Sequence, residues 1–142
     1  MTNRKNIPVL FVVSDNSEIR EMWTAFFLKQ YDVLGMETKS VTTYAAQHWP
    51  DVVLVDNPGS EPDDINTCRV IRRALTVPLI FLVENWRESH LLALYQAGTD
   101  DCVVKPVSPL LIRAKLKVWF HYTFSNSVNT LDTLEIENWR LR

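Results

Sequence analysis

Short apolar segments alternate five times with stretches of helical periodicity, and this alternation limits the folds open to the chain more than any other feature. The expected strands cover residues 8–13, 32–36, 52–55, 78–83 and 102–104. The central ones are apolar throughout, as is typical of strands that are buried on both faces. Strands of this kind in alternation with helices predict βαβ units, in which helices cover both faces of a parallel sheet.

Each stretch between these strands opens on a residue type that caps helices. The expected N-caps are one of Asp15, Asn16 and Ser17, then Ser40, Asp63 or Asp64, Asn85 and Ser108. The expected last helical residues are Gln30, Trp49, Leu75, Ala97 and Tyr122. Glu88 stands three residues after Asn85, as in a capping box, and Gly98 suits a C-cap. Five strands that alternate with five helices predict an α/β fold of the doubly wound, flavodoxin-like type, with a parallel sheet in the order 2-1-3-4-5.

Composition and charge exclude several classes of function. The net charge of -2 argues against a domain that binds DNA through a strongly basic face. None of the three glycines stands in a dinucleotide-binding or P-loop motif. Cys68 and Cys102 are too few for a disulfide framework and lack the spacing of a zinc site, so we expect two buried thiols. The apolar run at residues 9–13 is far shorter than a membrane span or a signal-peptide core, so we expect a cytoplasmic protein without a membrane partner.

Polar side chains follow the carboxyl ends of the first, third and fifth expected strands, where sheets of this type bind ligands. Ser14 and Asp15 follow the first strand, Asp56 the third and Lys105 the fifth. Taken singly, each residue is better explained as a helix cap, a loop residue or a surface lysine. Taken together, the two carboxylates would repel each other, and Mg²⁺ would relieve that repulsion while leaving room for phosphoryl oxygens. We therefore interpret this edge as a site where a carboxylate accepts a phosphoryl group beside a metal ion and a lysine.

Residues 7–122 resemble the receiver domain of two-component response regulators. The resemblance rests on residues 10–20, on residues 50–56, and on residues 97–101 followed by the Lys105-Pro106 pair. It implies that Asp56 accepts phosphate from a phosphohistidine on a sensor histidine kinase and that Lys105 contacts the phosphoryl group. It also implies a Mg²⁺ ion held by Asp15, Asp56 and the backbone carbonyl of Pro58, and a cis peptide bond at Lys105-Pro106. Output would pass through the face made by the fourth helix, fifth strand and fifth helix, and that face predicts a homodimer.

Four positions depart from the pattern of this family. Ser14 replaces the first of two acids, which should weaken Mg²⁺ binding because cation affinity follows ligand charge. Val83 replaces the switch hydroxyl and Cys102 the switch aromatic. Glu84 replaces a small residue and could pair with Lys105, repel a phosphoryl group or simply face solvent. The alternative function is therefore a pseudo-receiver that acts without phosphate as a protein–protein interaction or dimerisation module.

A third class, a small flavodoxin-like enzyme or cofactor-binding protein, is disfavoured. Asp15 and Glu18 make the turn after the first strand acidic, and they would repel a cofactor phosphate. We therefore expect no enzymatic activity. The three histidines share no helical face with a carboxylate, so none of them predicts a site.

The last residues predict a second unit. Residues 123–130 are expected to form a linker, and residues 131–142 alternate apolar and acidic side chains as a strand does. They resemble the start of the winged-helix effector domain found in receiver-containing transcription factors, and a terminal hairpin or frayed tail is the alternative. The parent protein would then contact DNA only through an effector domain that is missing here.

Overall fold

A computed structural model describes residues 7–128 of the chain. One sheet of parallel strands has the order β2-β1-β3-β4-β5. The strands are β1 (Val9–Val13), β2 (Asp32–Met36), β3 (Val52–Val55), β4 (Leu79–Val83) and β5 (Asp101–Val104). The helices are α1 (Ser17–Phe27), α2 (Val41–Gln47), α3 (Glu61–Ala74), α4 (Glu88–Ala97) and α5 (Pro109–Val128), with a short 3₁₀ helix, η2 (Thr38–Ser40). The predicted fold class and strand order are confirmed.

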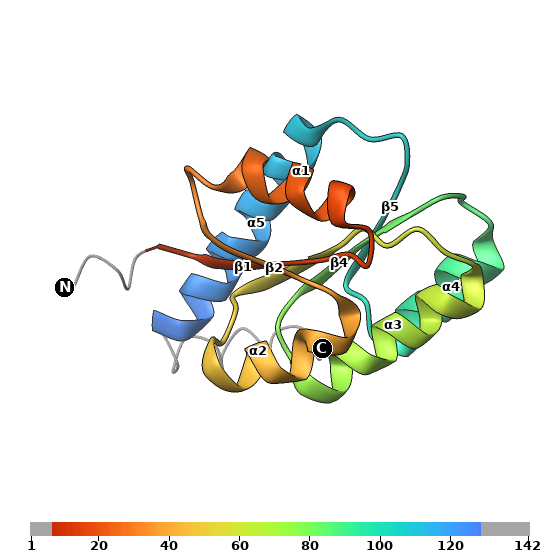
Figure 1. The fold of residues 1–142 in the computed structure, drawn as a ribbon, viewed down its shortest axis with the longest axis horizontal. Coiled ribbons are helices and arrows are strands. Elements are labelled where there is room, and N and C mark those ends of the chain that lie inside the picture. The colour runs from red at the N-terminus through yellow and green to blue at the C-terminus, as the bar shows by residue number, and fades with distance from the viewer. Residues whose placement is uncertain (1–6, 129–142) are drawn as a thin grey trace, which may run out of the picture.

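The helices form a layer on each face of the sheet. Helices α1 and α5 cover one face, and α2, α3 and α4 cover the other (Figure 1). Because side chains alternate along a strand, β1 contributes to both layers. Leu10 and Val12 pack with α1 and α5, whereas Phe11 and Val13 pack toward α2, α3 and α4. The polar ends of the strands are therefore held at one edge by apolar packing on both sides.

The start of α3 differs from the expectation. Ser60 is the N-cap, not Asp63 or Asp64. The Ser60 hydroxyl accepts a hydrogen bond from the Asp63 amide at 3.4 Å, and the Asp63 carboxylate accepts one from the Ser60 amide at 3.3 Å. This reciprocal pair is a capping box, and it begins the helix at Glu61. Asp64 consequently lies inside the helix, where its side chain is buried.

The predicted capping box at the start of α4 is wrong. The Asn85 side chain accepts a hydrogen bond from the Arg87 amide at 3.0 Å, so it closes a local turn in the loop instead of capping the helix. Helix α4 begins at Glu88, with Arg87 at the N-cap and no side-chain cap. At its other end Gly98 adopts a φ of 122°, as the predicted C-cap requires.

Three further helix ends also differ. Helix α1 ends at Phe27, before Gln30, and α2 ends at Gln47, before Trp49. Helix α5 continues through Val128, so it passes both Tyr122 and the start of the predicted linker at residue 123. The second unit predicted at residues 131–142 lies outside the described residues.

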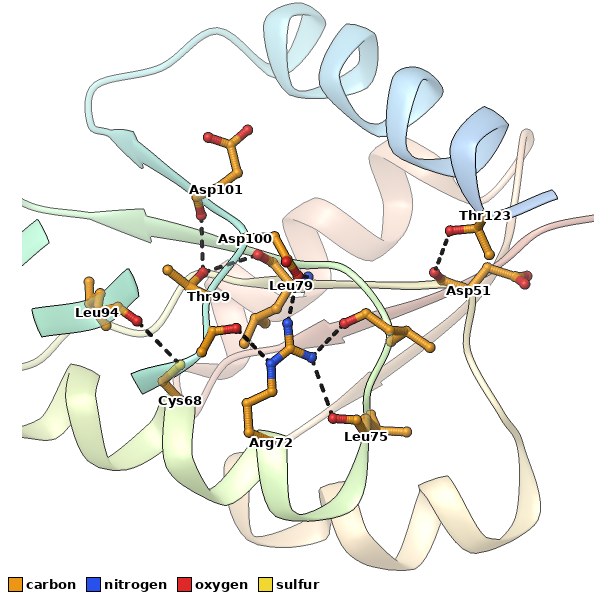
Figure 2. Close-up of polar contacts among 12 residues, drawn as sticks. Asp51, Cys68, Arg72, Leu75, Leu79, Leu94, Thr99, Asp100, Asp101 and Thr123 are labelled. Carbon is orange, nitrogen blue, oxygen red and sulfur yellow. Dashed lines mark hydrogen bonds and ion pairs between the residues drawn. The ribbon is translucent and has the colours of Figure 1, made fainter. Parts of the chain in front are cut away.

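Arg72 on α3 bonds to the segments that lead into the amino ends of β4 and β5, at the edge of the sheet opposite the predicted site. Its guanidinium donates hydrogen bonds to the carbonyls of Gly98 at 2.6 Å and Val77 at 2.5 Å. It also contacts the Asp100 carboxylate at 2.6 Å (Figure 2), and that carboxylate accepts the Leu79 amide at 2.8 Å. One planar cation therefore joins the end of α3 to the segments that lead into β4 and β5.

Candidate functional site

Asp56 and Lys105 come together at the carboxyl edge of the sheet, as expected. Asp56 directly follows β3 and is only 4% exposed. The Lys105 ammonium lies 2.7 Å from Oδ1 of Asp56 and 2.9 Å from Oε2 of Glu84. Partial burial opposes the charge of Lys105, but hydrogen bonds to both carboxylates outweigh burial and raise its pKa. The peptide bond between Lys105 and Pro106 is cis.

Trp23 is a member of the site that the sequence did not reveal. Its indole Nε1–H donates a hydrogen bond of 2.7 Å to Oδ2 of Asp56. Trp23 lies on α1 and is 3% exposed. Both oxygens of the buried Asp56 carboxylate therefore accept a hydrogen bond from a fixed donor, Lys105 on one side and Trp23 on the other.

The Asp15 carboxylate is hydrogen-bonded to residues other than Asp56 and Lys105. It accepts hydrogen bonds from the Thr38 amide at 2.8 Å and from the Asn57 side chain at 3.0 Å. The Asp15 amide in turn donates to the Asn57 side chain at 2.8 Å. Partial burial favours the neutral acid, but these hydrogen bonds outweigh it and lower the pKa of Asp15. Asp15 thus ties the end of β1 to η2 and to the residue after Asp56.

Ser14 is completely buried in the turn after β1. Its hydroxyl accepts a hydrogen bond from the Asn16 amide at 3.2 Å, and its carbonyl accepts one from Arg20 at 2.6 Å. Asn16 is the N-cap of α1, since its side chain accepts the Ile19 amide at 2.9 Å. Ser14 therefore serves the local geometry of the turn.

The arrangement of these residues does not fit the Mg²⁺ site expected at this edge. A cation would have to share the carboxylate oxygens of Asp15 and Asp56 with protein donors that already hydrogen-bond to them, and the donor on Oδ1 of Asp56 is the Lys105 ammonium, which is itself a cation. Between residues 7 and 128, no three His, Cys, Asp or Glu side chains are grouped so that they could hold a metal ion. A ligand role for the Pro58 carbonyl stays a prediction.

The other substituted positions belong to packing and to polar contacts. Val83 is buried in the apolar layer beneath α3 and α4. Glu84 forms the ion pair with Lys105 that was one of the three alternatives for this residue. The Cys102 amide donates to the Tyr95 hydroxyl at 3.1 Å, which joins β5 to α4. Burial and the nearby Asp101 charge raise the pKa of the Cys102 thiol to about 12, so the thiol is unreactive.

A buried contact between α3 and α4 pairs a histidine with a carboxylate on another helix, which the sequence did not indicate. Nε2 of His90 lies 3.0 Å from Oδ2 of Asp64, and both side chains are buried. Burial raises the pKa of Asp64 to about 6, although the His90 hydrogen bond opposes this shift. Arg87, at the start of α4, pairs with Glu61, and its Nε lies 3.1 Å from Oε2 of Glu61. An ion pair and a buried histidine–carboxylate contact thus join the beginnings of these helices.

None of the helices in the described part of the chain has the length and apolar character needed to cross a membrane.

The comparisons with known proteins agree with this geometry. The family "Response regulator receiver domain" matches residues 10–117. The uncharacterized transcriptional regulatory protein YclJ of Bacillus subtilis (strain 168) is 30% identical over 115 residues, covering 76% of this chain and 48% of YclJ. The transcriptional regulatory protein BaeR of Escherichia coli O6:H1 is 26% identical, covering 80% of this chain and 48% of BaeR. The chain therefore spans about half the length of these relatives.

Solved structures share the fold. The BeF3-activated N-terminal receiver domain of Klebsiella pneumoniae RstA has a TM-score of 0.66 and 22% identity, covering 79% of this chain and 97% of that one. A response regulator receiver modulated diguanylate cyclase from Pelobacter carbinolicus has a TM-score of 0.70 and 21% identity, covering 85% of this chain and 98% of that one. Receiver domains typically bind Mg²⁺ at the edge where Asp56 lies. On the family match and the YclJ relationship, this chain belongs to the response regulator receiver domain family.

Proposed function

We propose that this chain is the regulatory receiver module of a DNA-binding response regulator and that it acts through protein contacts without phosphorylation of Asp56. The observation that supports this function is the double hydrogen bonding of the Asp56 carboxylate. Lys105 holds one oxygen and Trp23 the other, each at 2.7 Å. The relatives with names that describe transcriptional regulators support the link to DNA, through a domain outside this chain.

The chemistry of an aspartyl phosphate would meet four obstacles at this site. The Asp56 oxygen would have to leave a hydrogen bond before it could attack a phosphorus atom. Ser14 contributes no charge toward a metal ion, and Val83 has no hydroxyl to bind a phosphoryl oxygen. Glu84 places a second carboxylate 2.9 Å from the Lys105 ammonium, where it would repel the phosphoryl oxygens.

Phosphorylation of Asp56 by a sensor histidine kinase is the second candidate function. It is favoured by the contact between Asp56 and Lys105, which matches the pair that the family uses. It would require Trp23 to release Oδ2 and Asp15 to exchange its hydrogen bonds for a Mg²⁺ ion. In this case too the chain would act as a regulator in the cytoplasm and not as an enzyme.

Output would use the face formed by α4, β5 and α5, through which we propose that the chain forms a homodimer. Leu92 and Tyr95 on α4 and Leu111 on α5 are large apolar side chains that are exposed there. Lys115 pairs within the chain with Asp101 at 3.2 Å, so this lysine is already neutralised on the face. Sedimentation at several concentrations, with Leu111→Glu as the disrupting variant, tests the dimer.

Intact-mass spectrometry tests the choice between the two functions. The whole chain is incubated with acetyl phosphate and Mg²⁺, beside Asp56→Asn as the variant that cannot accept phosphate. A variant that carries Ser14→Asp, Trp23→Phe, Val83→Thr and Glu84→Ala serves as the matched positive control, because it restores residue types typical of the family and removes the indole N–H from Oδ2 of Asp56. We expect the mass of the wild-type chain to stay unchanged. Addition of one phosphoryl group that Asp56→Asn abolishes would show instead that the chain is a phospho-acceptor.

A further inference from the structure

We propose that Trp23 takes the place of a metal ion at Asp56: its indole N–H occupies Oδ2 while Lys105 occupies Oδ1, so the carboxylate is satisfied without a divalent cation. This inference rests on the proposed function, because a receiver that uses no phosphate has no need of the metal that positions it. Trp23 is then the residue that keeps Asp56 free of a metal ion.

The geometry makes Trp23 a strong partner for Asp56. Its hydrogen bond of 2.7 Å is at the short end of the range for N–H donors, as expected for a charged acceptor. Both residues are almost fully buried. A buried carboxylate needs compensating donors, and a buried indole N–H needs an acceptor, so each group satisfies the other.

The position of the Trp23 ring is fixed by its aromatic neighbours. The ring stacks on Phe27, with centroids 5.8 Å apart and an interplanar angle of 10°, and it meets Phe26 edge-on at 6.4 Å. Arg113 covers the Phe26 ring at 5.7 Å. No buried side-chain nitrogen or oxygen among the described residues lacks a hydrogen-bond partner. If the ring turned away, the indole N–H and the Asp56 Oδ2 would both lose their hydrogen bond in a dry environment, so the closed arrangement is stabilised from two sides.

The charges around Asp56 agree with this role. The Lys105 ammonium balances Asp56, and Ser14 adds no second negative charge beside it. Asp15, which could have supplied one, is held by Thr38 and Asn57. A neutral donor such as the Trp23 indole is therefore sufficient, whereas an acid at position 14 would create a demand for a cation.

The inference predicts that restoring the acid alone does not restore the metal site. Ser14→Asp adds a ligand, but Trp23 still occupies Oδ2 of Asp56. Removal of the indole N–H in the double variant Ser14→Asp/Trp23→Phe frees that oxygen while keeping an aromatic ring against Phe27. We expect the double variant to bind Mg²⁺ about tenfold more tightly than Ser14→Asp, or better, because cation affinity follows the number of available charged ligands.

Calorimetric titration of the whole chain with Mg²⁺ measures this difference. Wild type and Trp23→Phe are titrated beside Ser14→Asp and the double variant, so that the four proteins form a double-mutant cycle. Circular dichroism confirms that each variant is folded. Equal affinity of Ser14→Asp and the double variant would overturn the inference. That result is independent of the proposed function, which instead fails if the wild-type chain takes up phosphate at Asp56.

A measurement on the wild-type chain covers the case in which a Trp23 variant does not fold. The indole N–H of Trp23 gives its own ¹H–¹⁵N resonance, assigned by the loss of its hydrogen-bonded shift in Asp56→Ala, which has no side-chain acceptor. We expect this resonance to keep its position and its protection from solvent exchange when Mg²⁺ is added. A saturable shift of the Trp23 resonance with Mg²⁺ would mean that a cation displaces the indole, and the inference would be wrong.

Discussion

Replacement of Lys105 by Met should destabilise the fold, because it leaves a buried carboxylate without its cation. Asp56 is 4% exposed and would keep only the hydrogen bond from Trp23. Met is close to Lys in length and apolar character, so the change removes the charge with little loss of packing. The effect therefore reports on the ion pair and not on a cavity.

The magnitude follows from the distance and the burial of the pair. At 2.7 Å and an effective dielectric constant of about 20, the attraction between the two charges is about 6 kcal/mol before desolvation is subtracted. Removal of one partner of a buried pair typically costs about 3–5 kcal/mol. The Lys105 side chain is 22% exposed, so water screens part of the interaction and we expect a loss of about 2–4 kcal/mol. The Glu84 side chain is 58% exposed, and its share should stay below about 1 kcal/mol.

Urea unfolding at pH 7, followed by circular dichroism, measures the free energy of unfolding of four proteins: wild type, Lys105→Met, Asp56→Asn and the double variant. The double variant should lose about 2 kcal/mol less than the sum of the single variants, because no buried charge is left unpaired. Glu84→Gln is the control for the exposed contact. A loss below about 1 kcal/mol in Lys105→Met, or strict additivity of the two changes, would refute the reasoning.

Three further predictions concern parts of the fold away from Asp56. Burial raises the pKa of Asp64 from 3.8 to about 6, so the stability that its proton contributes is complete below about pH 4 and is lost as the pH rises through about 6. The free energy of unfolding of Asp64→Asn, measured in urea relative to wild type, should therefore rise by about 2–3 kcal/mol between pH 4 and pH 7. A difference between the two proteins that stays the same at both pH values would contradict the assignment. Arg72→Lys should cost about 2–3 kcal/mol in the same assay, because an ammonium cannot reach the Gly98 and Val77 carbonyls and Asp100 together; a variant within about 0.5 kcal/mol of wild type would speak against this role. Gly98→Ala should lower the melting temperature, at a cost of about 1–3 kcal/mol, because φ is 122° and the new Cβ would lie 2.7 Å from Cγ of Arg72; an unchanged melting temperature would contradict it.

The sequence was sufficient for the sheet and for the pair of residues at its edge. Buried parallel strands can be recognised in a sequence as apolar runs, and the carboxyl ends of such strands lie at the same edge of the sheet. That rule places Asp56 and Lys105 at the same edge, where the structure shows them in contact at 2.7 Å. The alternation also predicted β3 at its observed bounds of Val52–Val55.

The indole of Trp23 could not be found in the same way. Helical spacing placed Trp23 on the buried face of α1 together with Phe27, and both are buried. Periodicity assigns a residue to a face, but it does not say where the N–H of a ring points. The usable signal was chemical: a tryptophan that is fully buried needs an acceptor, and Asp56 is the only buried carboxylate at the carboxyl edge of the described sheet.

The pair of Asp64 and His90 was missed in part because the N-cap of α3 was placed three or four residues too late, at Asp63 or Asp64 in place of Ser60. With Asp63 or Asp64 as the cap, Asp64 would lie at the exposed end of the helix. The Ser60 capping box begins α3 earlier, and the helix then turns Asp64 inward toward α4. The two residues are 26 positions apart on different helices, so no local pattern relates them.

The first turns of α3 and α4 are held together at the same end. Glu61 pairs with Arg87, and Asp64 contacts His90. The first turn of α3 follows the loop that begins after Asp56. A partner that displaced the start of α4 would therefore have to break these two contacts or move the start of α3, and with it the loop next to Asp56.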